Sequence, residues 1–299
     1  MSALIHYDHC PVCASADFRE VFRAPDHSVT RELFGVCECM ACGLRFTQDV
    51  PDADHIAPYY RSEEYISHTH SAKGMISRLY YLIRRRTLRK KRALLQRVTG
   101  LAAGRLLDYG SGTGAFAAVM QGAGWQVTGL EPDAGAREVA RTELGMELLP
   151  VAALKDLKGE RFDAITLWHV LEHVHELNDT LRQLRALLRP EGRLFIAVPN
   201  YTSWDARHYG PFWAAWDLPR HLYHFSPESM SRLLQLHGFE LRASLPMWYD
   251  GFYISLLSNR YRSGKTRPLT AFWNGFRSNL KALGDRRACS SLIYVASSS

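Results

Sequence analysis

The feature that most constrains the fold is an apolar run that reaches a carboxylate and then breaks into alternating glycines, Leu106-Leu107-Asp108-Tyr109-Gly110-Ser111-Gly112-Thr113-Gly114-Ala115. This order predicts the end of a buried strand, a tight loop and the start of a helix. Glycines let the backbone take positive φ angles and let a ligand approach more closely than a Cβ atom would permit. A nucleotide-like ligand is therefore the first hypothesis.

The glycine spacing alone leaves the ligand open, because Gly110-x-Gly112-x-x-Ala115 also fits the dinucleotide-binding fingerprint. Two acidic residues add information. Asp108 comes where the first strand ends, and a carboxylate facing the loop would repel a pyrophosphate but attract an ammonium group. Glu131 ends the next predicted strand about twenty residues further on, which is the spacing for binding a ribose diol.

A third segment, Phe162 to Val174, contains Trp168-His169-Val170-Leu171-Glu172-His173. Together the three features resemble the class I S-adenosylmethionine-dependent methyltransferases, whose glycine loop lies beside the methionine part of a cofactor that carries no phosphate. The resemblance implies a cofactor site made of Asp108, Gly110, Ser111, Gly112, Gly114, Glu131, Pro132, Trp168 and His169.

Within that site, Asp108 is expected to accept from the cofactor's amino group or a bridging water, and Glu131 to hold both ribose hydroxyls. The alternative for Asp108 is a helix N-cap. Residues 149–154 hold no acid, so adenine recognition is expected to use backbone groups and apolar packing.

From Gly104 onward, predicted strands and helices alternate, which indicates an α/β fold with a doubly wound, mostly parallel sheet. The resemblance implies a seven-stranded Rossmann-like methyltransferase domain over residues 104–299. Strands are expected at 105–108, 127–131, 147–149, 164–168, 193–198 and 238–242, with 291–296 added antiparallel, and helices at 134–143, 178–188 and 227–237. An aromatic-rich insertion at about 248–287 is expected to be helical over 251–261.

Residues 1–50 form a separate unit built on two Cys-x-x-Cys pairs, Cys10 with Cys13 and Cys39 with Cys42. Each pair places two thiolates in one turn, and two such turns can close a tetrahedral zinc site. We therefore predict a small zinc ribbon whose metal is structural, because four thiolates leave no open position. Cys37 is an alternative to Cys39 as ligand, and redox chemistry is the alternative for the pairs.

Residues 51–103 are predicted to be a linker followed by a long helix over about 75–98, the linker lining the mouth of the active site. The helix carries a dense set of cations: Arg84, Arg85, Arg86, Arg89, Lys90, Lys91 and Arg92. A solvated outer face is the plain interpretation of that set. Peripheral contact with an anionic membrane or a lipid-linked substrate is the alternative, and nucleic acid is less favoured.

Charge and composition narrow the choice of partner and of cellular compartment. The formal net charge of +7 and the pI of about 9.1 favour anionic partners, although only modestly. We expect a cytoplasmic protein, because no run reaches the roughly twenty apolar residues of a membrane span, the first residues lack a signal peptide, and the paired cysteines suggest metal in a reducing compartment.

The segment after the fifth predicted strand, residues 204–224, is rich in aromatic residues and histidines. Its end, Arg220-His221-Leu222-Tyr223-His224-Phe225-Ser226, resembles the corresponding stretch of zinc-ribbon sugar C-methyltransferases and ubiquinone-type O-methyltransferases. Methyl transfer to a hydroxyl or an enolisable carbon needs a base with a pKa near neutrality. His221 is the first candidate and His224 and His208 follow; His169 is expected to contact cofactor or substrate. The alternative is that His221 only orients the loop.

The sequence thus predicts methyl transfer from S-adenosylmethionine to oxygen or carbon of a small or lipid-linked metabolite. The second resemblance favours a sugar-derived acceptor. An RNA methyltransferase that binds its substrate through the zinc module is one alternative, and a non-catalytic cofactor-binding scaffold is another. The sequence leaves the acceptor and the oligomeric state open. No Asn/Asp-Pro-Pro-Tyr-like tetrapeptide follows the fourth strand, which argues against enzymes that methylate exocyclic amines of bases.

Overall fold

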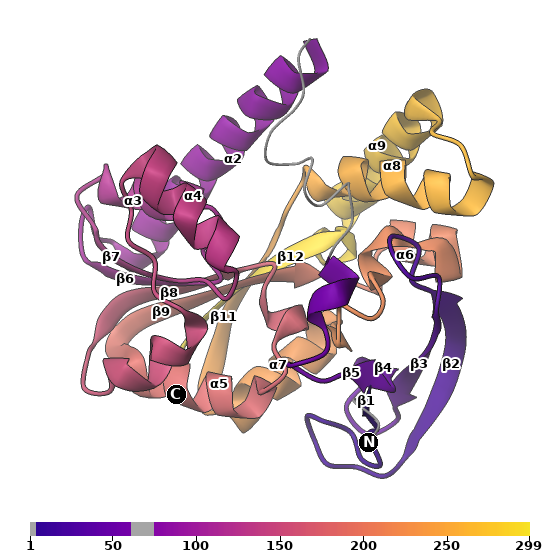
Figure 1. Ribbon diagram of the computed structural model, residues 1–299, viewed down its shortest axis with the longest axis horizontal. Coiled ribbons are helices and arrows are strands. Elements are labelled where there is room, and N and C mark those ends of the chain that lie inside the picture. Colours follow the sequence, from indigo (N-terminus) through magenta and orange to yellow (C-terminus); the bar gives the residue numbers. More distant parts are fainter. Residues whose placement is uncertain (1–3, 61–74) are drawn as a thin grey trace.

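The computed structural model describes residues 4–60 and 75–299, with the backbone alone over residues 75–82. Part of the predicted linker, residues 61–74, lies outside the described residues. A six-stranded sheet forms the centre, and a smaller sheet built mainly from N-terminal strands lies beside it (Figure 1).

The central sheet has the strand order β11-β12-β9-β8-β6-β7. Its parallel strands are β6 (Arg105–Tyr109), β7 (Gln126–Leu130), β8 (Phe162–Trp168), β9 (Leu188–Pro199) and β11 (Phe239–Pro246). The antiparallel strand β12 (Ser291–Ser298) lies between β9 and β11. The predicted doubly wound, mostly parallel sheet is therefore confirmed, including the antiparallel insertion of the C-terminal strand.

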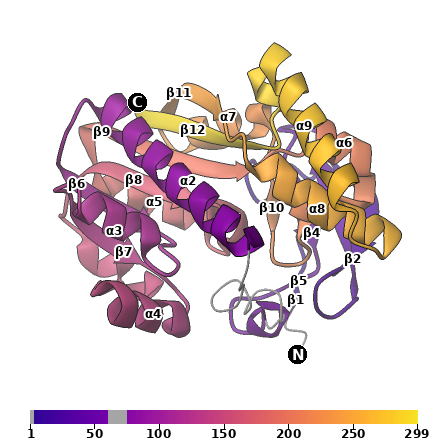
Figure 2. The same cartoon turned by 90° about the horizontal axis from the view of Figure 1, so that it is seen from above.

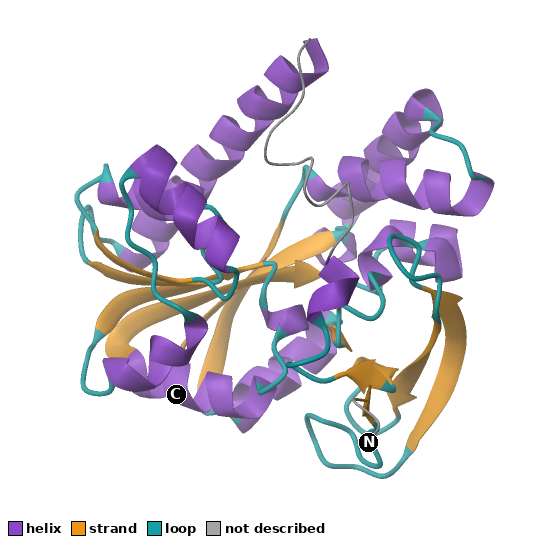
Figure 3. Cartoon of the chain, viewed as in Figure 1, coloured by secondary structure: helices purple, strands orange, loops and turns teal. Residues whose placement is uncertain are grey.

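Helices cover both faces of this sheet (Figure 3). The long α2 (Met75–Thr99), with α3 (Ala115–Gln121) and α4 (Ala134–Leu144), lies above the sheet in the view of Figure 1. Below it lie α5 (Leu177–Leu187) and α7 (Pro227–Leu236). The remaining helices, α6 (Trp204–Tyr209), α8 (Asp250–Ser263) and α9 (Pro268–Gly284), gather near the small sheet (Figure 2). Across the described chain, the helices include none that is long and apolar enough to cross a membrane.

The structure differs most from the predicted elements at three places. The expected strand at 147–149 is reduced to an isolated bridge between Leu149 and Leu130. Strand β9 begins at Leu188 instead of Arg193. Leu188 pairs with Phe162 of β8 and Arg193 pairs with Ala164, so the register between the two strands shifts and residues 189–192 lie within the shift. The insertion holds two helices, α8 and α9, where one was expected.

The small sheet has the order β10-β4-β3-β2 and contains β2 (Phe18–Pro25), β3 (Leu33–Cys39) and β4 (Arg45–Gln48). Its fourth strand, β10 (Tyr223–His224), comes from the histidine-rich loop that follows β9. A separate two-stranded ladder joins β1 (Leu4–Ile5) to β5 (Val50–Pro51). The N-terminal ribbon is thus continued, through backbone hydrogen bonds, by a segment of the larger domain.

A buried ion pair also joins the two parts. The Arg220 guanidinium lies 3.3 Å from an Asp26 carboxylate oxygen and 2.7 Å from one of Asp217. Asp26 is fully buried and also accepts from the backbone N–H groups of Ser28, Val29 and Thr30. Burial by itself raises the pKa of Asp26, but these donors and Arg220 outweigh it and lower the pKa. Asp26 is therefore an ionised anchor inside the protein, its charge held by backbone donors and Arg220 in place of water.

We predict that Asp26→Asn lowers the free energy of unfolding by about 2 kcal/mol, because it removes a charge that Arg220 needs in a buried site. Urea titration followed by circular dichroism measures the change. Glu138→Gln is the matched control, since it removes the partner of Arg141 in an exposed pair and should leave the stability nearly unchanged. Equal stability of Asp26→Asn and the native chain would contradict the anchoring role.

Candidate functional site

The glycine loop has the backbone that its sequence predicts. Gly110, Gly112 and Gly114 all have positive φ angles, of 78°, 54° and 76°. A Cβ atom at Gly110 would lie 2.3 Å from a methyl carbon of Val170, so the loop packs directly on the segment that follows β8. A Cβ atom at Gly112 would meet no atom within 4 Å, so this part of the loop faces open space.

Glu131 holds the loop against the end of β7. Its two carboxylate oxygens accept from the backbone N–H of Gly112 at 2.7 Å and of Asp133 at 3.0 Å. The neighbouring Pro132 carbonyl accepts from the Arg137 guanidinium at 2.7 Å. Burial raises the pKa of Glu131, and the two backbone donors oppose that rise. Each oxygen can still accept a further hydrogen bond from a ligand hydroxyl.

Asp108 lies behind the loop and is 1% exposed. One carboxylate oxygen accepts from the Thr166 hydroxyl at 2.6 Å, and Ser111 Oγ donates to the Asp108 backbone oxygen at 2.8 Å. Burial raises the pKa of Asp108, whereas these hydroxyls and the nearby Lys91 lower it. The N-cap alternative is wrong, because α3 begins at Ala115, its N-cap residue is Gly114, and no side chain caps it.

The basic helix α2 contributes to this site. The Lys91 ammonium lies 4.3 Å from the centre of a Trp168 ring, and Trp168 packs edge-on against Phe116 at 5.4 Å. Burial lowers the pKa of Lys91 to about 8, against the opposing charges of Asp250 and Asp108. The interpretation of the helix cations as a solvated face therefore fails for Lys91, which faces the site.

His169 is held between two carboxylates. Its backbone φ is +59°, Nε2 lies 2.9 Å from an Asp250 oxygen and Nδ1 lies 3.4 Å from a Glu172 oxygen. Burial opposes protonation of the ring, but Asp250 and Glu172 outweigh it and raise the pKa of His169 to about 10. His169 is thus a cation at neutral pH and unsuited to act there as a base.

A second group, the histidine cluster, consists of Glu172, His173 and His221. Their nearest side-chain ligand atoms all lie within 4.8 Å of one another. His173 Nδ1 lies 2.9 Å from the Arg220 carbonyl, and His221 Nδ1 lies 2.9 Å from the Ala215 carbonyl. Since a carbonyl only accepts, each Nδ1 carries the hydrogen and each Nε2 is left to accept a proton.

The two histidines of the cluster differ in their surroundings. The rings meet edge to face with centroids 4.6 Å apart. Burial and the neighbouring His221 lower the pKa of His173 to about 4, so His173 is neutral. His221 Nε2 lies 3.8 Å from an Asp217 oxygen, and although burial opposes ionisation, Arg220 lowers the pKa of Asp217 to about 2. His221 Nε2 therefore faces an ionised carboxylate.

The other two histidine candidates lie elsewhere. His224 is 3% exposed, with Nε2 3.1 Å from the hydroxyl of Thr47 on β4. Burial and His221 hold the pKa of His224 well below its usual range. His208, on α6, stacks on Trp204 with ring centroids 4.8 Å apart. The structure therefore brings only His221 into the cluster with Glu172 and His173, and His224 lies in the ribbon contact.

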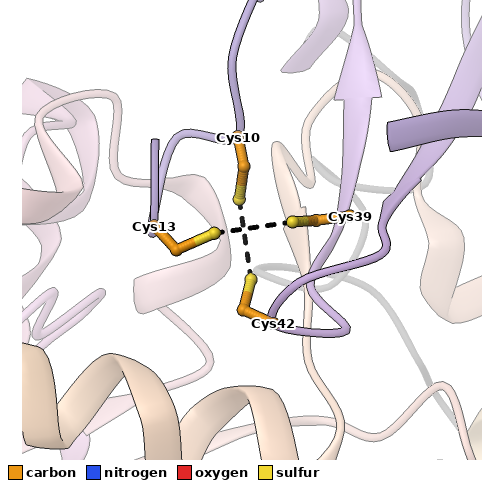
Figure 4. Close-up of side chains that lie close together, drawn as sticks. All are labelled: Cys10, Cys13, Cys39 and Cys42. Carbon is orange, nitrogen blue, oxygen red and sulfur yellow. Dashed lines mark hydrogen bonds between the residues drawn. The ribbon is translucent and has the colours of Figure 1, made fainter. Parts of the chain in front are cut away.

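The four paired cysteines converge on one point (Figure 4). The Sγ atoms of Cys10 and Cys42 are 3.6 Å apart, and those of Cys13 and Cys39 are 3.5 Å apart. A zinc ion about 2.3 Å from four tetrahedral thiolates requires sulfur separations of about 3.8 Å. The cluster is thus compatible with zinc, and it contains Cys39 and not the alternative Cys37.

A narrow cleft lies between the ribbon, the histidine-rich loop and α8. Its walls include His27, Trp213, Trp216, Asp217, Arg220 and Tyr261. His27 stacks on Tyr261 with ring centroids 4.5 Å apart. Because Asp217 lines the cleft and also lies beside His221, the cleft adjoins the histidine cluster.

Several of these contacts were not predicted from the sequence. Asp250, Asp217 and the role of Lys91 come from elements that are distant along the chain from the glycine loop. The dense cations of α2 gave a signal for Lys91, but nothing in their spacing distinguishes those that face the site, such as Lys91 and Arg84, from the rest.

The chain is similar to known proteins in both sequence and fold. A family model described as a methyltransferase domain matches residues 81–244. The ubiquinone biosynthesis O-methyltransferase of Xanthomonas euvesicatoria pv. vesicatoria is 30% identical over 163 residues, which is 50% of this chain and 68% of the relative. That of Nitrosococcus oceani is 30% identical over 178 residues, 55% of this chain and 73% of the relative.

A solved structure supports the fold. The magnesium protoporphyrin IX methyltransferase of Synechocystis PCC 6803, crystallised with S-adenosylhomocysteine, aligns with a TM-score of 0.52 at 14% identity. The alignment covers 81% of this chain and 97% of that structure.

We predict that, relative to His169→Gln, the native chain loses about 2 kcal/mol of unfolding free energy between pH 6.5 and 10, because the stabilisation from protonated His169 is present below its unfolded pKa and is lost as pH rises towards 10. This energy is well below the value that the full pKa shift of His169 corresponds to. The reason is that 32% of the His169 side chain is exposed, so water screens its charge. Urea titrations across this range measure it.

His169→Gln should remove this part of the pH dependence. His6→Gln, which alters an exposed histidine paired with Asp49, should leave it unchanged. If the native chain and His169→Gln lose stability in parallel up to pH 10, the charged state of His169 is refuted.

Proposed function

Because this chain belongs to the methyltransferase-domain family and is an S-adenosylmethionine-dependent methyltransferase, we propose that it methylates a hydroxyl oxygen of a small metabolite with His221 as general base. The observation that carries the proposal is the set of contacts that His221 makes: Nδ1 is hydrogen-bonded to a carbonyl, and Nε2 lies beside the ionised Asp217. Methylation of a carbon next to a carbonyl is the second candidate, since it needs the same base.

The cofactor would be held by the glycine loop and the carboxylates behind it. Gly112 leaves open space in the loop, Glu131 retains capacity to accept from hydroxyls, and Asp108 places a buried carboxyl group behind them. A carboxyl group at this position suits a ligand that carries a sulfonium and an ammonium group. S-adenosylmethionine, when bound, supplies an electrophilic methyl group. Trp168 and the cationic His169 complete the wall of this site.

His221 would take the proton of the acceptor hydroxyl at Nε2. The Ala215 carbonyl fixes the tautomer that leaves Nε2 unprotonated, and Asp217 stabilises the imidazolium that forms. His173 stays neutral beside His221, so no positive charge on His173 opposes the imidazolium that forms at His221. His224 has no place in this proton transfer and instead supports the loop through Thr47.

We also propose a structural zinc ion bound by Cys10, Cys13, Cys39 and Cys42. Four thiolates fill a tetrahedral coordination shell, so the metal would take no part in the chemistry. Its role would be to fix the ribbon, whose strand β4 supports β10 and hence the loop that carries His221.

The cleft beside Asp217 encloses only about 10 Å³, room for a water molecule and not for a metabolite, so the acceptor would approach His221 from outside this cleft. The similarity to enzymes named for O-methylation in ubiquinone biosynthesis supports an oxygen acceptor. A sugar-derived acceptor rests on the resemblance of the ribbon and residues 220–226 to sugar methyltransferases, and a lipid-linked acceptor on the cations of α2. The RNA alternative instead requires binding that weakens steeply with salt.

We predict that His221→Ala lowers kcat about 100-fold or more, the usual contribution of a positioned base, without changing the affinity for S-adenosylmethionine. Radiolabelled cofactor with a panel of phenolic and sugar hydroxyl acceptors measures turnover, and calorimetry measures cofactor binding. His208→Asn, on the neighbouring helix, should keep kcat within about twofold. Unaltered kcat in His221→Ala would refute the base, whereas a native chain that fails to bind the cofactor would overturn the proposed function itself.

We predict that Cys39→Ser loses zinc and becomes largely insoluble, because the ribbon is too small to fold without its metal. Elemental analysis of the purified native chain should give about one zinc per chain, as a four-thiolate site requires. Cys37→Ser should retain the metal, since Cys37 lies outside the cluster. Loss of zinc from Cys37→Ser but not from Cys39→Ser would reverse the assignment.

A further inference from the structure

Helix α9 packs on the protein through small and polar side chains. Its buried residues are Ala271, Asn274, Gly275, Ser278 and Ala282. Asn274 donates to the Tyr209 hydroxyl at 2.8 Å, and Ser278 donates to Asp205 at 2.8 Å. A Cβ atom at Gly275 would lie 2.7 Å from a ring carbon of Phe252, so α8 and α9 are in close contact. These contacts fix which side of α9 faces inward.

The large apolar residues of α9 consequently face outward. We call Leu269, Phe272, Trp273, Phe276, Leu280 and Leu283 the α9 stripe; their exposed fractions run from 38% at Phe276 to 87% at Leu269. Their spacing of one, three or four residues places them along one side of the helix. A surface helix of a globular protein normally has the opposite arrangement, with its apolar side inward. Figures 1 and 2 show α8 and α9 at the periphery, away from the central sheet.

The same segment is strongly basic. Residues 251–284 contain no Asp or Glu and six cations: Arg260, Arg262, Lys265, Arg267, Arg277 and Lys281. Arg277 and Lys281 belong to α9 itself, where with Trp204 and Leu280 they line a groove. An exposed apolar stripe flanked by cations is the pattern of a helix that lies in the interface of an anionic membrane.

We propose that the α9 stripe docks on the surface of an anionic lipid bilayer. The apolar side chains enter the interface, while the flanking Lys and Arg side chains reach the lipid phosphates. A second copy of this chain fits the surface less well, because a two-fold contact would place these cations against their own copies. The helix would lie along the membrane and not cross it.

The position of the α9 stripe would also determine how close the candidate site lies to the membrane. Helix α8, which packs directly on α9, begins with Asp250, the partner of His169. A docked enzyme would therefore hold its candidate site close to the lipid surface. This proposal does not depend on His221 being the base.

Flotation of the full chain with lipid vesicles tests the proposal. We expect it to bind vesicles of phosphatidylcholine and phosphatidylglycerol, and the triple variant L269S/W273S/L283S to bind at least tenfold more weakly. These three side chains are more than half exposed, so their loss should leave the fold and cofactor affinity intact, which circular dichroism and calorimetry check. The matched control is L33S/L236S, since Leu33 and Leu236 are exposed at 64% and 45% on β3 and α7.

The charge component has its own test. R277Q/K281Q should weaken binding to the anionic vesicles, and added salt should do the same. Equal binding to vesicles of phosphatidylcholine alone would refute the preference for anionic lipid.

Three results would overturn the docking itself: a native chain that does not float with the anionic vesicles, a triple variant that floats as well as the native chain, or a native dimer that the triple variant converts to a monomer without any lipid binding. The last result would show that the stripe is a contact between copies.

Discussion

The backbone pairing of β10 with β4, together with the buried Arg220 that joins Asp26 to Asp217, is the contact on which the candidate site depends. Through it, the Thr47 hydroxyl donates to the His221 carbonyl at 2.6 Å, so the ribbon sets the backbone position of the proposed base. Arg220 also lowers the pKa of the carboxylate beside that base. The N-terminal ribbon is therefore part of the framework of the site.

Charge separates the histidines into different roles. His169 lies between Asp250 and Glu172 and is a cation, whereas His173 lies in a buried, neutral state beside His221. The chemical group is the same in each case, and the neighbouring carboxylates and carbonyls make the difference. Proximity to the glycine loop in sequence is therefore a weak guide to which histidine accepts a proton.

Much of this arrangement could be predicted from local sequence. The glycine loop, Glu131 and the Cys-x-x-Cys pairs are short motifs, and strand and helix periodicity gave the central sheet. The pairs Arg220–Asp26 and His169–Asp250 could not be predicted, because each joins residues brought together only by the tertiary fold. The outward direction of the α9 stripe could not be predicted either, because periodicity marks an apolar side of a helix but not whether that side faces the core or solvent.

The position of β12 has a consequence for the order of assembly. This strand is synthesised after all the others of the central sheet, yet it pairs with both β9 and β11. Until it emerges from the ribosome, β9 presents an open edge and β11 has no neighbour in the sheet. Such edges are sites of mispairing between nascent chains. The four ribbon cysteines are synthesised before the central sheet begins, but that sheet closes only with its last strand.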